Sequence, residues 1–141
     1  MTTEARNEDT YNLDEMSSLE IVSIMNKEDA KVPEAISKHL KEISQIVDMA
    51  VDSLEKNGRI IYLGAGTSGR LAVSDASECP PTFGVSPDVV IGLIAGGEDA
   101  FIKAIEGAED SLDLAVNDLK NLNLSKNDIY QASLTLKELW K

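Results

Sequence analysis

Hydrophobic residues recur at helical spacing in the first part of the chain and in short unbroken runs in the second. Residues 1–16 show no apolar period and are expected to form an extended N-terminal arm. Ser17 and Glu20 have the spacing of a capping box, which predicts a helix of about two turns ending before Asn26. Apolar residues then recur every three or four positions, which predicts one longer helix that ends at Asn57-Gly58. This stripe consists of Val32, Ile36, Leu40, Ile43, Val47, Ala50 and Leu54.

Two apolar runs in the second part of the chain, residues 59–63 and 89–95, lack polar alternation. Such runs predict strands that are covered on both faces, as in a parallel sheet. A third strand is expected to begin at Ile129-Tyr130. The order of strands and intervening helices predicts an α/β fold with a parallel sheet. The helices are expected at residues 71–78, 98–105 and 112–122.

The composition limits the classes of function. The formal net charge of the 141 residues is −12, so a nucleic-acid partner is not expected. The single cysteine, Cys79, excludes an internal disulfide, and with the single histidine, His39, it offers no metal site of the usual kind. No apolar run is long enough to cross a membrane, and the polar N-terminus does not resemble a signal peptide. These features predict a cytoplasmic protein.

The segment after the first predicted strand has the composition of an anion-binding turn. It reads Gly64-Ala65-Gly66-Thr67-Ser68-Gly69-Arg70. Its glycines allow close approach of the backbone to a ligand, its hydroxyls add donors, and the helix behind it presents unpaired N–H groups. It is neither a P-loop nor a dinucleotide fingerprint, because the lysine of the first and the acidic ribose contact of the second are missing. A phosphate is the expected ligand, and a tight turn without a ligand is the alternative.

Carboxylates follow both predicted strands. Glu78 precedes Cys79-Pro80-Pro81, which is expected to end the helix because proline cannot donate the helical hydrogen bond. A carboxylate at that end of a helix opposes the helix dipole, so its pKa is expected to be raised, as a general acid requires. A second acidic group could meet it at the carboxyl ends of the strands. The alternative, for Glu78 and for the second acidic group, is that these carboxylates lie on the solvent-exposed face of a helix and have no role in catalysis. The second group consists of Glu98, Glu106, Glu109 and Asp110.

Four blocks of the sequence, in this order and spacing, resemble the N-acetylmuramic acid 6-phosphate etherases, a family of the sugar isomerase (SIS) domain superfamily. The resemblance extends over roughly residues 3–129 and includes the N-terminal arm. It implies a three-layer SIS-type parallel sheet flanked by helices and preceded by an N-terminal helical segment. The blocks are Ile61–Leu71, Asp75–Thr82, Gly92–Glu98 and Glu106–Ser111.

The resemblance also implies an activity. The family cleaves the D-lactyl ether of N-acetylmuramic acid 6-phosphate by elimination and hydration, without a metal or cofactor, in cell-wall recycling. Glu78 matches the acid that protonates the departing ether oxygen, and Glu109 matches the second glutamate, the base at C2. Family members are homodimers with the active site near the subunit interface. The residues that match the family's sugar-phosphate contact are Gly64, Gly66, Thr67, Ser68 and Gly69.

The chain departs from the family pattern after Ile129. Family members are much longer and carry a second glycine- and serine-rich phosphate loop, which the last eleven residues do not match. The sheet is therefore expected to be incomplete, unless the tail or a partner chain supplies the missing cover. Two alternatives to an active enzyme remain: an inactive module that only binds a phosphosugar, and a chain that does not fold stably alone. The expected parts are an arm (1–16), helices (17–57), a partial SIS domain (58–130) and a divergent tail (131–141).

Overall fold

The computed structural model describes residues 6–103, 105, 107–108 and 112–133. The chain divides into two compact units, residues 1–45 and 46–141. The first unit begins with two short 3-10 helices, Glu8–Thr10 and Leu13–Glu15, where an extended arm was expected. None of the helices in the described part of the chain combines the length and the apolar character needed to span a membrane.

The first α-helix confirms the capping box but not the predicted end. Helix α1 spans Ser18–Asp29, the Glu20 amide donates to the Ser17 hydroxyl, and the Glu20 carboxylate accepts from the Ser17 amide at 2.8 Å. The predicted end before Asn26 is wrong. The helix continues past Asn26 because asparagine inside a helix costs only a fraction of a kcal/mol. The next residue, Lys27, makes an ion pair of 2.8 Å with Asp9.

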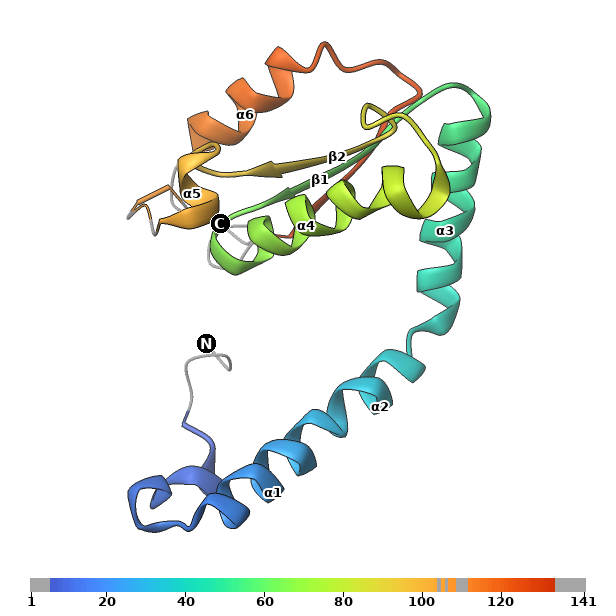
Figure 1. Ribbon diagram of the computed structural model, residues 1–141. Helices are drawn as coiled ribbons and strands as arrows, with labels where there is room; N and C mark the ends of the chain where they lie inside the picture. Colours follow the sequence, from blue (N-terminus) through green and yellow to red (C-terminus); the bar gives the residue numbers. More distant parts are fainter. Residues whose placement is uncertain (1–5, 104, 106, 109–111, 134–141) are drawn as a thin grey trace. The chain divides into compact units, whose positions relative to one another are not determined.

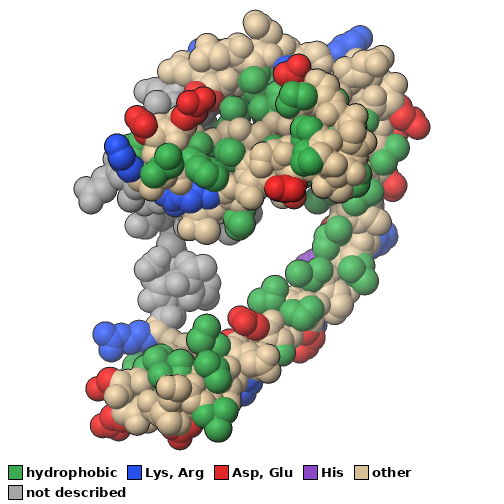
Figure 2. All heavy atoms as spheres, viewed as in Figure 1, with side chains coloured by type: hydrophobic (Ala, Val, Ile, Leu, Met, Phe, Trp, Pro, Cys, Tyr) green, Lys and Arg blue, Asp and Glu red, His purple; other side chains and the backbone are tan. Residues whose placement is uncertain are grey.

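The apolar stripe that predicted one long helix is divided between two. Helix α2 spans Lys31–Ser37 and helix α3 spans Leu40–Glu55. The helix breaks because the amides of Lys38 and His39 donate to carbonyls three residues back, which tightens the last turn of α2. His39 is exposed, as expected. The stripe is also largely exposed, with Val32 at 57% and Leu40 at 59%, and Figure 2 shows hydrophobic side chains on the surface of these helices.

The second unit contains the predicted parallel sheet. Strands β1 (Ile60–Gly64), β2 (Val90–Ile94) and β3 (Ile129–Ser133) are arranged in the order β2-β1-β3. The α/β fold class and the third strand are confirmed, and β3 extends three residues beyond Tyr130. The middle strand supplies the fully buried Ile61, as expected of a strand with a neighbour on each side.

Helices cover both faces of this sheet. Helix α4 (Gly66–Phe83) packs against β1 and β2, and Figure 1 shows α6 (Leu112–Asn121) on the other side of the strands. Helix α5 (Asp99–Ile102) is shorter than expected. The two connections between the strands, one through α4 and one through α5 and α6, therefore build the layers that the sequence predicted.

The predicted end of α4 at Glu78 is wrong. The helix continues through Pro80 and Pro81 to Phe83, because the φ of proline is compatible with a helix, although each proline leaves out one helical hydrogen bond. Gly84 provides the stop in the left-handed conformation (φ 66°), and its amide donates to the Pro80 carbonyl at 2.9 Å. Glu78 therefore lies inside the helix, and the argument from a carboxylate at the helix terminus does not apply.

Three glycines permit close packing of α4 on the strands. A Cβ at Gly64 would lie 2.6 Å from the Gly69 nitrogen, and a Cβ at Gly69 would lie 2.6 Å from the Gly64 oxygen. A Cβ at Gly92 of β2 would lie 2.6 Å from the Ala72 oxygen and from the Val73 Cα. All of these obstacles except one Ile94 side-chain atom are backbone, so any larger residue would push the helix away from the sheet.

The amino ends of β1 and β3 are joined by a buried ion pair. The Arg59 guanidinium donates to Asp128 at 2.7 Å and to the Leu122 carbonyl at 3.0 Å, and the Asp128 side chain is only 3% exposed. The Asp128 carboxylate also accepts from the backbone amides of Arg59 (2.9 Å) and Ser125 (2.8 Å). The hydrogen bond from the Arg59 side chain, together with those from the two amides, holds the pKa of Asp128 well below its usual range, although burial opposes this shift.

Gly92→Ala is expected to lower the free energy of unfolding by about 2–3 kcal/mol, because backbone atoms of α4 must move to admit the methyl group. Gly84→Ala is the matched control, since open space surrounds Gly84 and only its positive φ adds a cost of about 1 kcal/mol. Urea denaturation at pH 7 measures both. Equal losses in the two variants would show that the close contact at Gly92 is not a constraint.

Asp128→Asn is expected to lower the free energy of unfolding by about 2 kcal/mol at pH 7, because charged hydrogen bonds to Arg59 are lost. Since the folded-state pKa of Asp128 is depressed, its contribution is present above the unfolded pKa of about 3.9 and is lost as pH falls below it. The difference between wild type and variant should therefore shrink in acid. The exposed pair Asp52–Lys56 supplies the control, Asp52→Asn, with a loss below about 0.5 kcal/mol.

Candidate functional site

The glycine-rich segment forms the first turn of α4 rather than a loop that precedes it. The helix begins at Gly66, five residues before the predicted start, and its N-cap, Ala65, makes no side-chain hydrogen bond. The amides of Gly66, Thr67 and Ser68 precede the first helical bond, which the Gly69 amide donates to the Ala65 carbonyl at 3.2 Å. Uncapped amides at the start of an eighteen-residue helix suit a phosphate or carboxylate.

The five expected phosphate-binding residues divide into two groups. Gly66, Thr67 and Ser68 face accessible space: Gly66 has a φ of 53° with no atom within 4 Å of an added Cβ, and Thr67 is exposed. Gly64 and Gly69 are buried and lie against each other. The second pair therefore holds the helix close to β1, and only the first three residues offer donors to a ligand.

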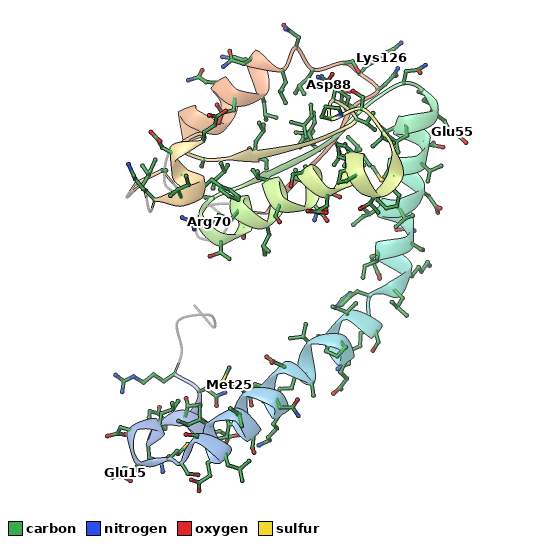
Figure 3. The ribbon with its side chains drawn as sticks, viewed as in Figure 1. Glu15, Met25, Glu55, Arg70, Asp88 and Lys126 are labelled. Carbon is green, nitrogen blue, oxygen red and sulfur yellow. The ribbon has the colours of Figure 1, made fainter. Side chains whose placement is uncertain are left out.

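The one cation of this segment is already engaged. The Arg70 guanidinium donates to the Phe101 carbonyl at 2.9 Å and to the Lys103 carbonyl at 3.4 Å. Figure 3 shows Arg70 at the beginning of α4. Arg70 thus ties the first turn of α4 to α5, and backbone amides rather than a positive side chain supply the local attraction for an anion.

A pocket of about 410 Å³ lies beside this turn. Polar side chains from three elements line it: Tyr62 of β1, Ser68 and Asp75 of α4, and Gln131 of β3. Burial, and then the negative charge of Asp75, raise the pKa of Tyr62, so its phenol remains a protonated hydrogen-bond donor. The site thus combines a turn of uncapped amides with an adjoining pocket that both polar and apolar residues line.

The structure does not bring Glu78 into this pocket. Glu78 is exposed and follows Ser68 by ten residues, about 15 Å along the axis of α4. Glu109, with Glu106 and Asp110, lies outside the described residues, so the expected meeting of two carboxylates stays a prediction. Among the residues that the structure describes, no group of three or more His, Cys, Asp or Glu side chains is arranged to hold a metal ion.

Residues 42–136 match the model of the glucokinase regulatory protein N-terminal SIS domain. The chain is 57% identical over 128 residues to the N-acetylmuramic acid 6-phosphate etherase of Clostridium beijerinckii, and 60% identical over 128 residues to that of Exiguobacterium sp.. These alignments cover 91% of this chain. The chain belongs to the SIS domain family, and the relatives that it resembles over this length are N-acetylmuramic acid 6-phosphate etherases. The resemblance stated from the four sequence blocks is confirmed.

The chain matches only part of these etherases. It spans 42% of the Clostridium beijerinckii protein, 44% of the Exiguobacterium protein and 43% of a third etherase, from Halalkalibacterium halodurans, to which it is 57% identical over 129 residues. The matched SIS region nevertheless contains the glycine-rich turn, Glu78 and Glu109. All site residues expected from the sequence therefore fall within the family match.

Tyr62 and Asp75 were missed as candidate site residues. Asp75 follows Ser68 by seven residues, which is two helical turns and places both on one face of α4. That spacing was visible in the sequence, but only with the correct helix start at Gly66 does it connect Asp75 to the first turn of α4. Tyr62 looked like one more apolar position in a buried strand, and no sequence signal marked it as facing a pocket.

Asp75→Asn is expected to lower the pKa of Tyr62, because it removes a negative charge that opposes the phenolate. The pKa should stay above the usual value, since burial is the larger cause and remains. A pH titration followed through the tyrosine ring resonances measures it, with Tyr11→Phe and Tyr130→Phe used to assign the signals. Asp99→Asn, in α5, should leave the titration of Tyr62 unchanged, and an unchanged titration in Asp75→Asn would refute the contact.

Proposed function

We propose that this chain acts as a carbon–oxygen lyase that cleaves the D-lactyl ether of N-acetylmuramic acid 6-phosphate, yielding N-acetylglucosamine 6-phosphate and D-lactate. The observation that carries the proposal is the identity of 57–60% to etherases over 91% of the chain. The free amides of Gly66, Thr67 and Ser68 support it, because they suit the phosphate of the substrate. The net charge of −12 and the proposed metabolic role of this chain also support a cytoplasmic location.

The proposed reaction needs two carboxyl groups and no electron transfer. In the ring-opened sugar the aldehyde at C1 acidifies the C2 proton, which a base removes. The electron pair forms a C2–C3 double bond as the C3–O bond breaks, and an acid protonates the departing lactate oxygen. Water then adds to C3 and a proton returns to C2. We assign the acid to Glu78 and the base to Glu109, which match the family's two glutamates.

A homodimer is part of this proposal. About 15 Å of helix separates the free amides near Ser68 from Glu78 on the same chain. A pyranose 6-phosphate is shorter than this between its phosphorus atom and C3. The spacing therefore favours an active site in which Glu78 of one copy approaches a sugar whose phosphate lies at the amides of another copy.

A second candidate is a module that binds a phosphosugar without turning it over. The observation that favours it is the distance within α4, since Glu78 follows Ser68 by about 15 Å and lies outside the pocket. The amides of the first turn of α4 and the adjoining pocket both lie within the described part of the chain, whereas the proposed base, Glu109, does not. Binding and catalysis are therefore separable in experiment.

The purified chain is expected to release D-lactate from N-acetylmuramic acid 6-phosphate, and Glu78→Gln is expected to reduce the rate at least about 100-fold, because the departing oxygen loses its proton donor. Glu55→Gln, at the exposed end of α3, is the matched control and should retain the full rate. Solvent deuterium should appear at C2 of the product. Folded wild type that binds N-acetylglucosamine 6-phosphate but releases no lactate would refute the lyase and support the binding module.

A further inference from the structure

Arg70 joins the first turn of α4 to the segment that follows β2. It comes two residues after Ser68, and its guanidinium donates to the Phe101 carbonyl at 2.9 Å and to the Lys103 carbonyl at 3.4 Å. Both carbonyls lie at the end of α5, where a helix has no amides of its own left to bind its last carbonyls. The Arg70 side chain therefore caps α5 and holds it against the start of α4.

The chain beyond α5 is packed against the end of β2. Gly96, two residues after this strand, has a φ of 94°, and an added Cβ there would lie 3.1–3.3 Å from side-chain atoms of Ala100, Ile105 and Ala108. Ala100 and Ala108 are buried, with exposed fractions of 5% and 8%. Ala108 therefore has a defined place beside the carboxyl end of β2.

This packing fixes the part of the chain that leads to the proposed base. Glu109 is the next residue after Ala108 in the sequence. The uncapped amides proposed to bind the phosphate belong to residues 66–68, directly before the Arg70 link. Since a displacement of about 1 Å between reacting groups can cost about 100-fold in rate, the distance between these two parts of the chain matters for catalysis.

The geometry separates this role from a direct contact with the phosphate. Nε and Nη2 of Arg70 form one edge of the guanidinium, and both donate to backbone carbonyls at the end of α5. An arginine edge of this kind is the one that pairs with an oxyanion through two parallel hydrogen bonds. Binding the phosphate through this edge would therefore break the link to α5.

We propose that Arg70 is a positioning residue of the proposed lyase, which sets the place of the chain leading to Glu109 relative to the bound phosphate by holding α5 against α4. The inference rests on the proposed function. It assigns Arg70 no contact with the substrate and no proton transfer. It requires that loss of the Arg70 side chain slows removal of the C2 proton and leaves the affinity for the phosphate group unchanged.

Arg70→Ala is expected to lower kcat for D-lactate release about 10- to 100-fold, because the base is no longer held at its distance from C2. The Kd of N-acetylglucosamine 6-phosphate should change by less than about twofold, since the amides that bind the phosphate remain. The isotope effect with substrate deuterated at C2 should rise, because proton removal becomes slower relative to the other steps. Arg70→Lys should recover part of the rate, since its ammonium can donate to the Phe101 carbonyl. Lys120→Ala, which removes an exposed charge from α6, is the control and should retain the full rate.

Amide hydrogen exchange provides a second measurement, which does not depend on activity. The Lys103 amide donates to the Asp99 carbonyl at 2.9 Å, and the Ala108 amide donates to the Ile105 carbonyl at 3.4 Å. Both amides should exchange at least about tenfold faster in Arg70→Ala, because the segment opens more often without its link to α4. The amides of β1 should exchange at the wild-type rate, which also establishes that the sheet of the variant is folded.

Several results would overturn this role and leave the proposed function intact. Unchanged hydrogen exchange or an unchanged kcat in Arg70→Ala would show that the link does not position the segment. Weaker binding of N-acetylglucosamine 6-phosphate would show that Arg70 binds the phosphate itself, and a lower kcat with an unchanged isotope effect would show a purely structural role. Folded wild-type protein that releases no D-lactate would contradict the proposed function and this inference together.

Discussion

The close contact between the first turn of α4 and the end of β1 is the constraint on which the rest of the second unit depends. Gly64 and Gly69 lie against each other with no room for a side chain on either. This contact holds the first turn of the helix, with the amides of Gly66–Ser68, at the end of β1. Gly92 of β2 likewise leaves no room for a side chain against α4, so this one helix packs closely on two strands. The turn with its uncapped amides and the adjoining pocket are both consequences of this packing.

The opposite ends of the strands are fixed by charge rather than by close packing. Asp128 accepts hydrogen bonds from the side chain and backbone of Arg59 and from the amide of Ser125, so β3 cannot slide along β1 without breaking several of them. Parallel strands distant in sequence have little local structure to set their register. The ion pair provides that information, and the resulting register places Gln131 opposite Tyr62 at the pocket.

The sequence was informative where one physical rule acts alone. The apolar runs predicted β1 and β2, and the spacing of Ser17 and Glu20 predicted the start of α1, because burial and capping are local properties. The predictions failed where two rules compete. Pro80 and Pro81 suggested a helix end, but the φ of proline is compatible with a helix, and the left-handed conformation of Gly84 determines the stop. The pocket was missed for a different reason: Tyr62, Asp75 and Gln131 meet only through the sheet register, which no local pattern encodes.

The proposed binding groups and the proposed catalytic groups are separate because they depend on different contacts. The free amides and the pocket depend on contacts among β1, β3 and α4, all of which the described residues contain. Catalysis requires in addition that two carboxylates approach one sugar, and Glu78 lies on an exposed stretch of α4, outside the pocket. Much of the apolar surface of the helices is also exposed. Because the proposed binding needs only local packing, whereas the proposed turnover needs groups brought together over a longer range, the proposed binding of a phosphosugar depends on fewer contacts than the proposed catalysis.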